Sequence, residues 1–272
     1  MKTIFLLLML ISSSTQAQVQ VSKNLEPSVL VYNTTRNRVE HARNTHTVRP
    51  IASISKIMTA MVTLDHDKDL SRTLKLSRQA GSHLPHQTYN RWQLLLAMLV
   101  RSDNAAAETL AQDYPGGRTA FIARMNSQAQ EWGMTQTRFE DPTGLGANNT
   151  STVTDIAEMM EISAGYWLIR ETTTRKQVAV ETQSKKSTQT VNLVNTNSPL
   201  LSEFDSIIVG KTGLTSKAGW CVGLVVEHKK SQYVIIVLGA KTKQDRIRTV
   251  EKIMYNHVIY NQLSEMELII NP

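Results

Sequence analysis

The sequence predicts a mixed α/β fold, with one sheet built from both ends of the chain and helices supplied by its middle. Short runs rich in β-branched residues lie near the start, at 28–32 and 38–41, and near the end, at 207–209, 220–226 and 233–238. Between them, apolar residues recur at helical spacing. Strands from both ends can join one mixed sheet if the helices form an insert, so the 272 residues are expected to build one sizeable core.

Residues 1–17 are expected to be a signal peptide that is removed on export. Lys2 gives a positive start, residues 4–11 form an unbroken apolar run, and Thr15-Gln-Ala17 offers a small-residue cleavage site. A transmembrane anchor needs roughly 20 apolar residues, and this run is far shorter. We therefore expect a periplasmic protein whose mature chain, residues 18–272, carries no transmembrane anchor.

The first elements of the mature chain are predicted to be a strand pair and a helix. Ser28–Tyr32 and Arg38–His41 have the character of two short strands on either side of the polar turn Asn33–Asn37. An amphipathic helix is predicted to begin near Pro50. Its apolar residues follow at i, i+3, i+4, i+7 and i+8, namely Ile54, Ile57, Met58, Met61 and Val62.

Helices and connectors are predicted for the middle of the chain. Further helical stretches lie at 92–100, 105–111, 118–132 and 155–163. Gly133 suits a C-cap of the third stretch, and Thr152 or Thr154 can cap the fourth. The turn-rich connector Asp141–Gly146 separates these two helices.

The last part of the chain is predicted to return to strands and to end in a helix. Thr172–Val194 is rich in Ser and Thr and alternates in polarity, which indicates exposed strands or a hairpin. Ile207–Val209, Trp220–Val226 and Tyr233–Leu238 are candidates for buried strands. Ile247–Leu263 has the pattern of a closing amphipathic helix.

Composition argues against several kinds of partner and site. The formal charge of +7 is dispersed, without the continuous basic face and interleaved aromatics of a nucleic-acid site, and favours at most peripheral attraction to an anionic membrane or wall. The single cysteine, Cys221, cannot form an intrachain disulfide and is expected to be a buried hydrophobe. The seven histidines are scattered, and Pro85 separates His83 from His86, so no metal or other cofactor is expected.

The first chemical motif is Ser53-Ile-Ser-Lys56, which places a hydroxyl and an amine one helical turn apart. A serine hydroxyl needs a neighbouring base to become a nucleophile. The apolar flanks of Lys56 would lower the pKa of its amine towards that of a useful base, and the helix N-terminus favours an oxyanion near Ser53. The alternative is a Ser near an N-cap with a surface Lys one turn on, and for an isolated motif that alternative is favoured.

The second and third motifs supply the groups that such a nucleophile would need. Ser102-Asp-Asn104 lies at a break between helices, where Ser102 could relay a proton and Asn104 could bind a substrate amide, although the pattern is also common in turns. Lys211-Thr-Gly213 follows a buried strand. Lys211 and Thr212 can hold a substrate carboxylate, and Gly213 lets a peptide lie alongside the strand. It is improbable that all three motifs arose together in this order by chance.

The chain resembles the D-alanyl-D-alanine peptidases, the low-molecular-mass penicillin-binding proteins, and most of all their endopeptidase branch. The resemblance extends beyond the three motifs over almost all of the mature chain. It includes Ser28–Asn33, Pro50–Met61, Ala80–Pro85, Tyr114–Gly117, Gly133–Phe139, Asp141–Leu145, Asn195–Asn197 and Val209–Thr215.

This resemblance implies a penicilloyl-serine-transferase fold, in which a five-stranded antiparallel sheet with packed helices adjoins an all-helical lobe, here approximately residues 65–165. It implies that Ser53 is acylated, that Lys56 is its base and that Ser102 and Asn104 form the opposite wall. Lys211 and Thr212 would bind the substrate carboxylate or carbonyl, and the backbone N–H groups of Ser53 and Leu214 would form the oxyanion hole.

The implied substrate is the D-Ala-containing cross-link of peptidoglycan, with β-lactam antibiotics as covalent inhibitors. The segment after Gly213 can finish the sheet and a helix but not an additional β-domain, which favours the endopeptidase and leaves a carboxypeptidase as the alternative. A class A β-lactamase would need a deacylating Glu-x-x-x-Asn between Ser102 and Lys211, and none is present. A non-catalytic wall-binding or β-lactam-sensing module is a further alternative, against which the intact motif residues argue.

Overall fold

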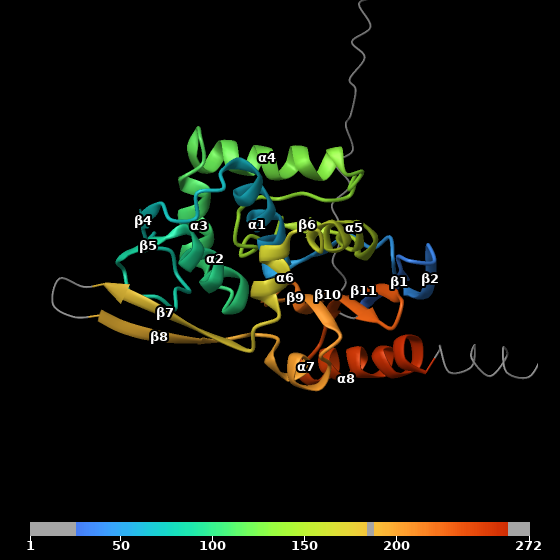
Figure 1. The fold of residues 1–272 in the computed structure, drawn as a ribbon. Coiled ribbons are helices and arrows are strands. Elements are labelled where there is room, and N and C mark those ends of the chain that lie inside the picture. Colours follow the sequence, from blue (N-terminus) through green and yellow to red (C-terminus); the bar gives the residue numbers. More distant parts are fainter. Residues whose placement is uncertain (1–25, 184–187, 261–272) are drawn as a thin grey trace, which may run out of the picture.

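The computed structural model describes residues 26–183 and 188–260 and confirms the predicted mixed α/β fold (Figure 1). Its centre is a five-stranded antiparallel sheet with the strand order β2-β1-β11-β10-β9. The strands are β1 (Ser28–Asn33), β2 (Arg38–Arg43), β9 (Ile207–Thr215), β10 (Gly219–His228) and β11 (Ser231–Ala240). A strand from the early part of the chain therefore pairs with one from its late part, β1 with β11.

The segment between β2 and β9 supplies most of the helices and three small strand pairs. Its helices are η1 (Ala52–Ile54), α1 (Ser55–His66), α2 (Arg91–Val100), α3 (Asn104–Gln112), α4 (Gly117–Glu131), α5 (Val153–Ser163), α6 (Trp167–Thr173) and α7 (Ser198–Glu203). The strand pairs are β3 (Arg49–Pro50) with β6 (Thr150–Ser151), β4 (Thr73–Lys75) with β5 (Thr88–Asn90), and β7 (Gln177–Gln183) with β8 (Thr188–Val194).

After β11 the chain forms α8 (Lys243–Ile253) and the π-helix η2 (Met254–Ile259). Figure 1 shows α7 and α8 on one face of the sheet, with α1, α5 and α6 on the other. Within the described ranges, every helix is too short or too polar to cross a membrane. The predicted signal peptide and the end of the predicted closing helix, residues 261–263, lie outside these ranges.

The two faces of the sheet bury two separate hydrophobic clusters. In β10, Cys221 and Val225 point to the cluster that includes α1 and α5, whereas Val222, Leu224 and Val226 point to the cluster that includes α8. Because both faces are covered, β10 is almost continuously apolar rather than alternating, and each buried Val or Leu contributes about 1.5–3 kcal/mol. The sheet is thus a rigid support for β9, one of its two edge strands.

Several boundaries differ from the sequence prediction. Pro50 pairs in β3 instead of opening a helix, and the 3₁₀ turn η1 precedes α1. The predicted strand region from Thr172 begins with the end of α6, a short helix that packing on α2 and β9 stabilises. The Lys211-Thr-Gly213 motif lies inside β9 and not at its end, because β10 continues to pair with it as far as Thr215.

Candidate active site

Ser53 lies on η1, at the junction between β3 and α1, with its side chain partly exposed. Two glycines pack against the backbone of this turn. A Cβ at Gly144 would lie 1.9 Å from the carbonyl oxygen of Ala52, and a Cβ at Gly213 would lie 3.1 Å from the Ser53 amide nitrogen. Ala52 itself has a left-handed φ of 49°, which is strained for a residue with a Cβ. The serine is therefore held by close backbone contacts on two sides.

Lys56 is fully buried one turn beyond Ser53, and its amine contacts three oxygens. Nζ lies 2.9 Å from Ser53 Oγ, 2.8 Å from Asn104 Oδ1 and 2.5 Å from the Thr143 carbonyl oxygen. Burial lowers the pKa of Lys56 to about 7, although the negative charges of Asp141, Asp103 and Glu108 oppose this. A large fraction of this amine is consequently neutral at neutral pH.

The three oxygens around Lys56 differ in one chemical respect. A carbonyl or amide oxygen can only accept a hydrogen bond, whereas the Ser53 hydroxyl can also donate one. When the amine is neutral it has two N–H groups and one lone pair, and the oxygens of Asn104 and Thr143 take the two N–H groups. The lone pair is then left for the Ser53 hydroxyl, which is the geometry for taking its proton.

Ser102 and Lys211 meet on the other side of the site. Ser102 lies between α2 and α3 with a left-handed φ of 65°. Lys211 Nζ donates to Ser102 Oγ at 3.0 Å and to the Thr212 carbonyl at 2.9 Å. Burial lowers the pKa of Lys211 well below that of a free lysine, and the nearby Lys56 and Arg246 charges lower it further.

The remaining residues of the predicted site lie near these two lysines. Asn104 orients Lys56 through Oδ1, and its Nδ2 lies 3.4 Å from the Ala80 carbonyl. The Thr212 hydroxyl donates to that of Thr196 at 2.6 Å. Leu214 is half exposed on β9, next to the glycine that faces Ser53. The structure therefore brings the residues of all three motifs together.

One contact was not expected from the sequence, and three partners were missed. Among the described hydrogen bonds, Ser102 binds Lys211 and not Lys56. The missed partners are Thr143, Gly144 and Thr196. Thr143 and Gly144 lie in the Asp-Pro-Thr-Gly-Leu segment that carried part of the family resemblance, but nothing in one sequence shows which distant turn reaches Lys56.

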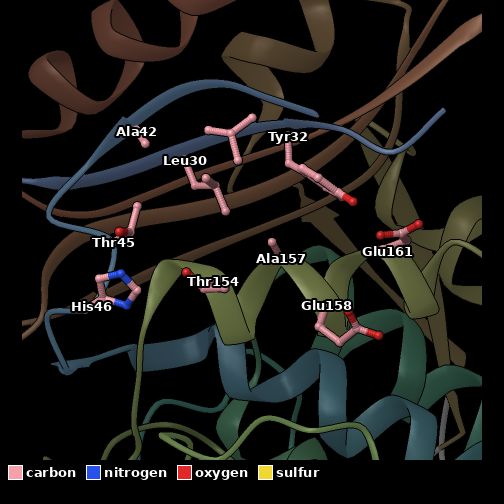
Figure 2. Close-up of a pocket in the computed structure, with 10 residues that line it drawn as sticks. Leu30, Tyr32, Ala42, Thr45, His46, Thr154, Ala157, Glu158 and Glu161 are labelled. Atoms are coloured by element: carbon pink, nitrogen blue, oxygen red, sulfur yellow. The ribbon is translucent and has the colours of Figure 1, made fainter. Parts of the chain in front are cut away.

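A separate cavity of about 470 Å³ lies between the β1–β2 strands and α5 (Figure 2). Leu30, Tyr32 and Ala42 line its sheet side, and Ala157 and Glu161 its helix side. No residue of the three motifs lines this cavity, so it is distinct from the Ser53 site. Across the described part of the chain, no group of three or more His, Cys, Asp or Glu side chains is placed to hold a metal ion.

Fold and site together define a serine peptidase that works by acyl transfer. The chain belongs to the D-alanyl-D-alanine carboxypeptidase family, whose profile it matches over residues 13–242. The family that the sequence motifs indicated is thereby confirmed.

Curated relatives and solved structures agree with this family. The chain is 35% identical to the D-alanyl-D-alanine endopeptidase of Pseudomonas aeruginosa over 223 residues, which cover 78% of this chain and 71% of that protein. It is 34% identical to the Escherichia coli D-alanyl-D-alanine endopeptidase, covering 84% and 75%. A penicillin-binding protein of Listeria monocytogenes in its ampicillin-bound form superposes with a TM-score of 0.75 at 30% identity, covering 84% of this chain and 95% of that one.

Proposed function

We propose that this protein is a serine D,D-peptidase of peptidoglycan that hydrolyses D-Ala-containing cross-links as a D-alanyl-D-alanine endopeptidase. The observation that carries the proposal is the 2.9 Å contact between Ser53 Oγ and the fully buried amine of Lys56. Endopeptidase is favoured over other activities because three of the relatives, from Pseudomonas, Escherichia and Haemophilus, have that activity. Carboxypeptidase activity is the second candidate, since further relatives remove terminal D-Ala.

In the proposed reaction, the neutral Lys56 amine takes the Ser53 proton while Oγ attacks the carbonyl carbon of the D-Ala peptide bond. The N–H groups of Ser53 and Leu214 stabilise the oxyanion. The C–N bond then breaks, and the leaving amine takes the proton from Lys56 through Ser102. The Lys211 amine donates to the Ser102 oxygen, which leaves the Ser102 proton available for this relay. Water then hydrolyses the acyl-enzyme on Ser53.

The substrate is proposed to lie along β9, the edge strand of the sheet that carries Lys211-Thr-Gly213. An edge strand has unpaired backbone groups that an extended peptide can bind as an added strand. Gly213 leaves the room for this, and Lys211 and Thr212 hold the substrate carboxylate or carbonyl. Asn104 binds the peptide amide through the N–H groups of its side chain.

β-Lactams are proposed to acylate Ser53, and the resulting acyl-enzyme is proposed to be hydrolysed slowly. The Listeria relative has solved ampicillin-bound and cefotaxime-bound forms. No Glu-x-x-x-Asn motif lies between Ser102 and Lys211 to activate a deacylating water. We expect Ser53→Ala to abolish covalent labelling by a fluorescent penicillin and the wild type to hydrolyse nitrocefin very slowly. Stoichiometric labelling of Ser53→Ala, or rapid nitrocefin hydrolysis, would contradict this part of the proposal.

We also propose that the enzyme works in the periplasm, because peptidoglycan lies there and residues 1–17 have the pattern of a signal peptide. Residues 18–272 would then form the catalytic domain, with a helical lobe at approximately 65–165 beside the sheet lobe. Any association of this domain with a membrane or with the wall would be peripheral.

The decisive experiment separates the two activities by their products. Purified cross-linked muropeptide dimers and free pentapeptides are incubated with wild type and with Ser53→Ala, and the products are identified by mass spectrometry. Conversion of dimers to monomers by wild type alone supports the endopeptidase. Loss of one terminal D-Ala from pentapeptides without dimer cleavage would replace it with the carboxypeptidase, and no product from either would refute both.

A further inference from the structure

The turn Asp141–Gly146 is organised around one buried carboxylate. Asp141 Oδ1 accepts hydrogen bonds from the Thr143 amide, the Thr143 hydroxyl and the Gly144 amide at 2.6–2.7 Å. Oδ2 accepts from the Gly146 amide and from Asn149 Nδ2, each at 2.7 Å. These bonds outweigh the burial of the group and lower the pKa of Asp141, so the carboxylate is charged and holds five neutral donors.

This turn packs directly against α1, the helix that carries the base. Two successive carbonyls of the turn accept side-chain hydrogen bonds from α1, that of Pro142 from the Thr59 hydroxyl at 2.7 Å and that of Thr143 from Lys56 Nζ at 2.5 Å. The next residue, Gly144, has a left-handed φ of 80° and lies against the backbone of the Ser53 turn. The successive residues Thr143 and Gly144 therefore contact the base and the backbone of the nucleophile's turn, respectively.

We propose that Asp141 is a positioning residue for the acylation reaction: its buried charge fixes the turn so that the Thr143 carbonyl occupies one N–H of Lys56 and the lone pair faces Ser53. The inference rests on the proposed function only in taking Lys56 as the base. It goes beyond it by assigning a task to a residue outside the three motifs that touches neither substrate nor reacting atoms.

Asp141 also acts on Lys56 through its charge. Three carboxylates raise the pKa of Lys56, and Asp141 has the largest effect of them. Glu108 is paired with the charge of Arg118, whereas Asp103 and Asp141 accept only from neutral donors. On the opposite side, the charge of Lys211 repels that of Lys56. Loss of the Asp141 charge should therefore lower the pKa of Lys56.

The test is the pH profile of acylation by a fluorescent penicillin in wild type, Asp141→Asn and Glu140→Gln. Asparagine keeps the shape of the side chain but removes the charge. We expect the acylation rate of Asp141→Asn to fall about 10- to 100-fold at its high-pH plateau, since the base is no longer held in line. We also expect the acid limb of its profile to move to lower pH. Glu140 is the neighbouring, exposed carboxylate, and its variant controls for loss of a nearby charge.

Each outcome decides the inference. A lower plateau together with a downward shift of the acid limb, absent in Glu140→Gln, supports it. A profile identical to wild type overturns it, and so does a lower plateau with an unmoved acid limb, because a merely structural turn would change the rate alone.

Two further measurements keep the test independent of folding and of the proposed function. If Asp141→Asn does not fold, Thr143→Val is tested in its place, because it removes one of the five donors and keeps the charge of Asp141. It should then lower the plateau without moving the limb, and an unchanged plateau would overturn the inference. Failure of the proposed function is seen separately, as penicillin labelling that survives Ser53→Ala.

Discussion

The burial of Lys56 should make the free energy of unfolding of this protein rise with pH. The substitution Lys56→Met should remove this contribution. The amine is fully buried, and its pKa falls from 10.5 in the unfolded chain to about 7 in the folded protein. Between these two values the unfolded chain binds more protons than the folded protein, so the folded state becomes more stable as pH rises. Below about pH 7 the amine is protonated in both states, and the folded state carries the full cost of the buried charge.

The size of this effect follows from linkage. A pKa difference of about 3.5 units costs the folded state about 5 kcal/mol at low pH, and about 2–3 kcal/mol of that cost is removed between pH 6 and pH 9. In Lys56→Met the side chain keeps a similar length but cannot titrate. The hydrogen bonds that this variant loses at Asn104 and Thr143 change its stability by an amount that does not vary with pH.

The assay is urea denaturation of wild type and Lys56→Met at several pH values from 6 to 9. We expect the free energy of unfolding of wild type to rise by about 2–3 kcal/mol relative to the variant over this range. The other groups titrate in both proteins. Lys211 is the exception, because the charge of Lys56 lowers its pKa, and relief of this repulsion in the variant adds to the difference at low pH with the same sign. Two parallel curves would refute the assignment of a strongly lowered pKa to Lys56.

Three other variants test the packing and the electrostatics of the site and of the helices behind it. Gly144→Ala places a Cβ where the nucleophile's turn already lies, so penicillin acylation should fall about 100-fold; a rate within twofold of wild type would contradict the close contact. Arg91→Met removes the closest cation from the buried Asp113 side chain and leaves it only the more exposed Arg72, so it should cost about 2–3 kcal/mol in urea denaturation, whereas a cost below about 1 kcal/mol would mean that the pair contributes little. Lys211→Met removes a cation near Lys56 and should raise the pKa of Lys56. With a small ester that has no carboxylate, the acid limb of the pH profile of acylation should therefore move to higher pH. An unmoved limb would show that Lys211 is already neutral.

The sequence was sufficient to predict the fold where local and global signals agree. Tyr233–Leu238 and Trp220–Val226 are β-branched and apolar without interruption, which fits strands that are buried on both faces, and the structure places them as β11 and β10. The short helices α6 and α7 were not predicted, because six or seven residues are too few for a periodic pattern and tertiary contacts decide their conformation.

In the candidate site, contacts between residues close in sequence could be predicted, whereas contacts between distant residues could not. The pairing of Ser53 with Lys56 depends only on helical spacing, so it was visible in the sequence. The Thr143 carbonyl reaches Lys56 across 87 positions of the chain, and it is a backbone atom whose identity does not depend on the side chain. Motif spacing cannot predict such a contact, although the Asp141-Pro-Thr-Gly pattern did indicate that a turn was present.

In the proposed reaction, the two buried lysines of this site need opposite protonation states, and their surroundings explain how one site can hold both. Lys56 must be neutral to act as a base, whereas Lys211 must be charged to hold a substrate carboxylate. The Lys56 cation lowers the pKa of Lys211, so a neutral Lys56 helps Lys211 to be charged, while the charge of Asp141 limits how far the pKa of Lys56 falls. An arriving carboxylate would neutralise the field of Lys211 and favour its charged form. The proposed substrate would therefore stabilise the cation that binds it.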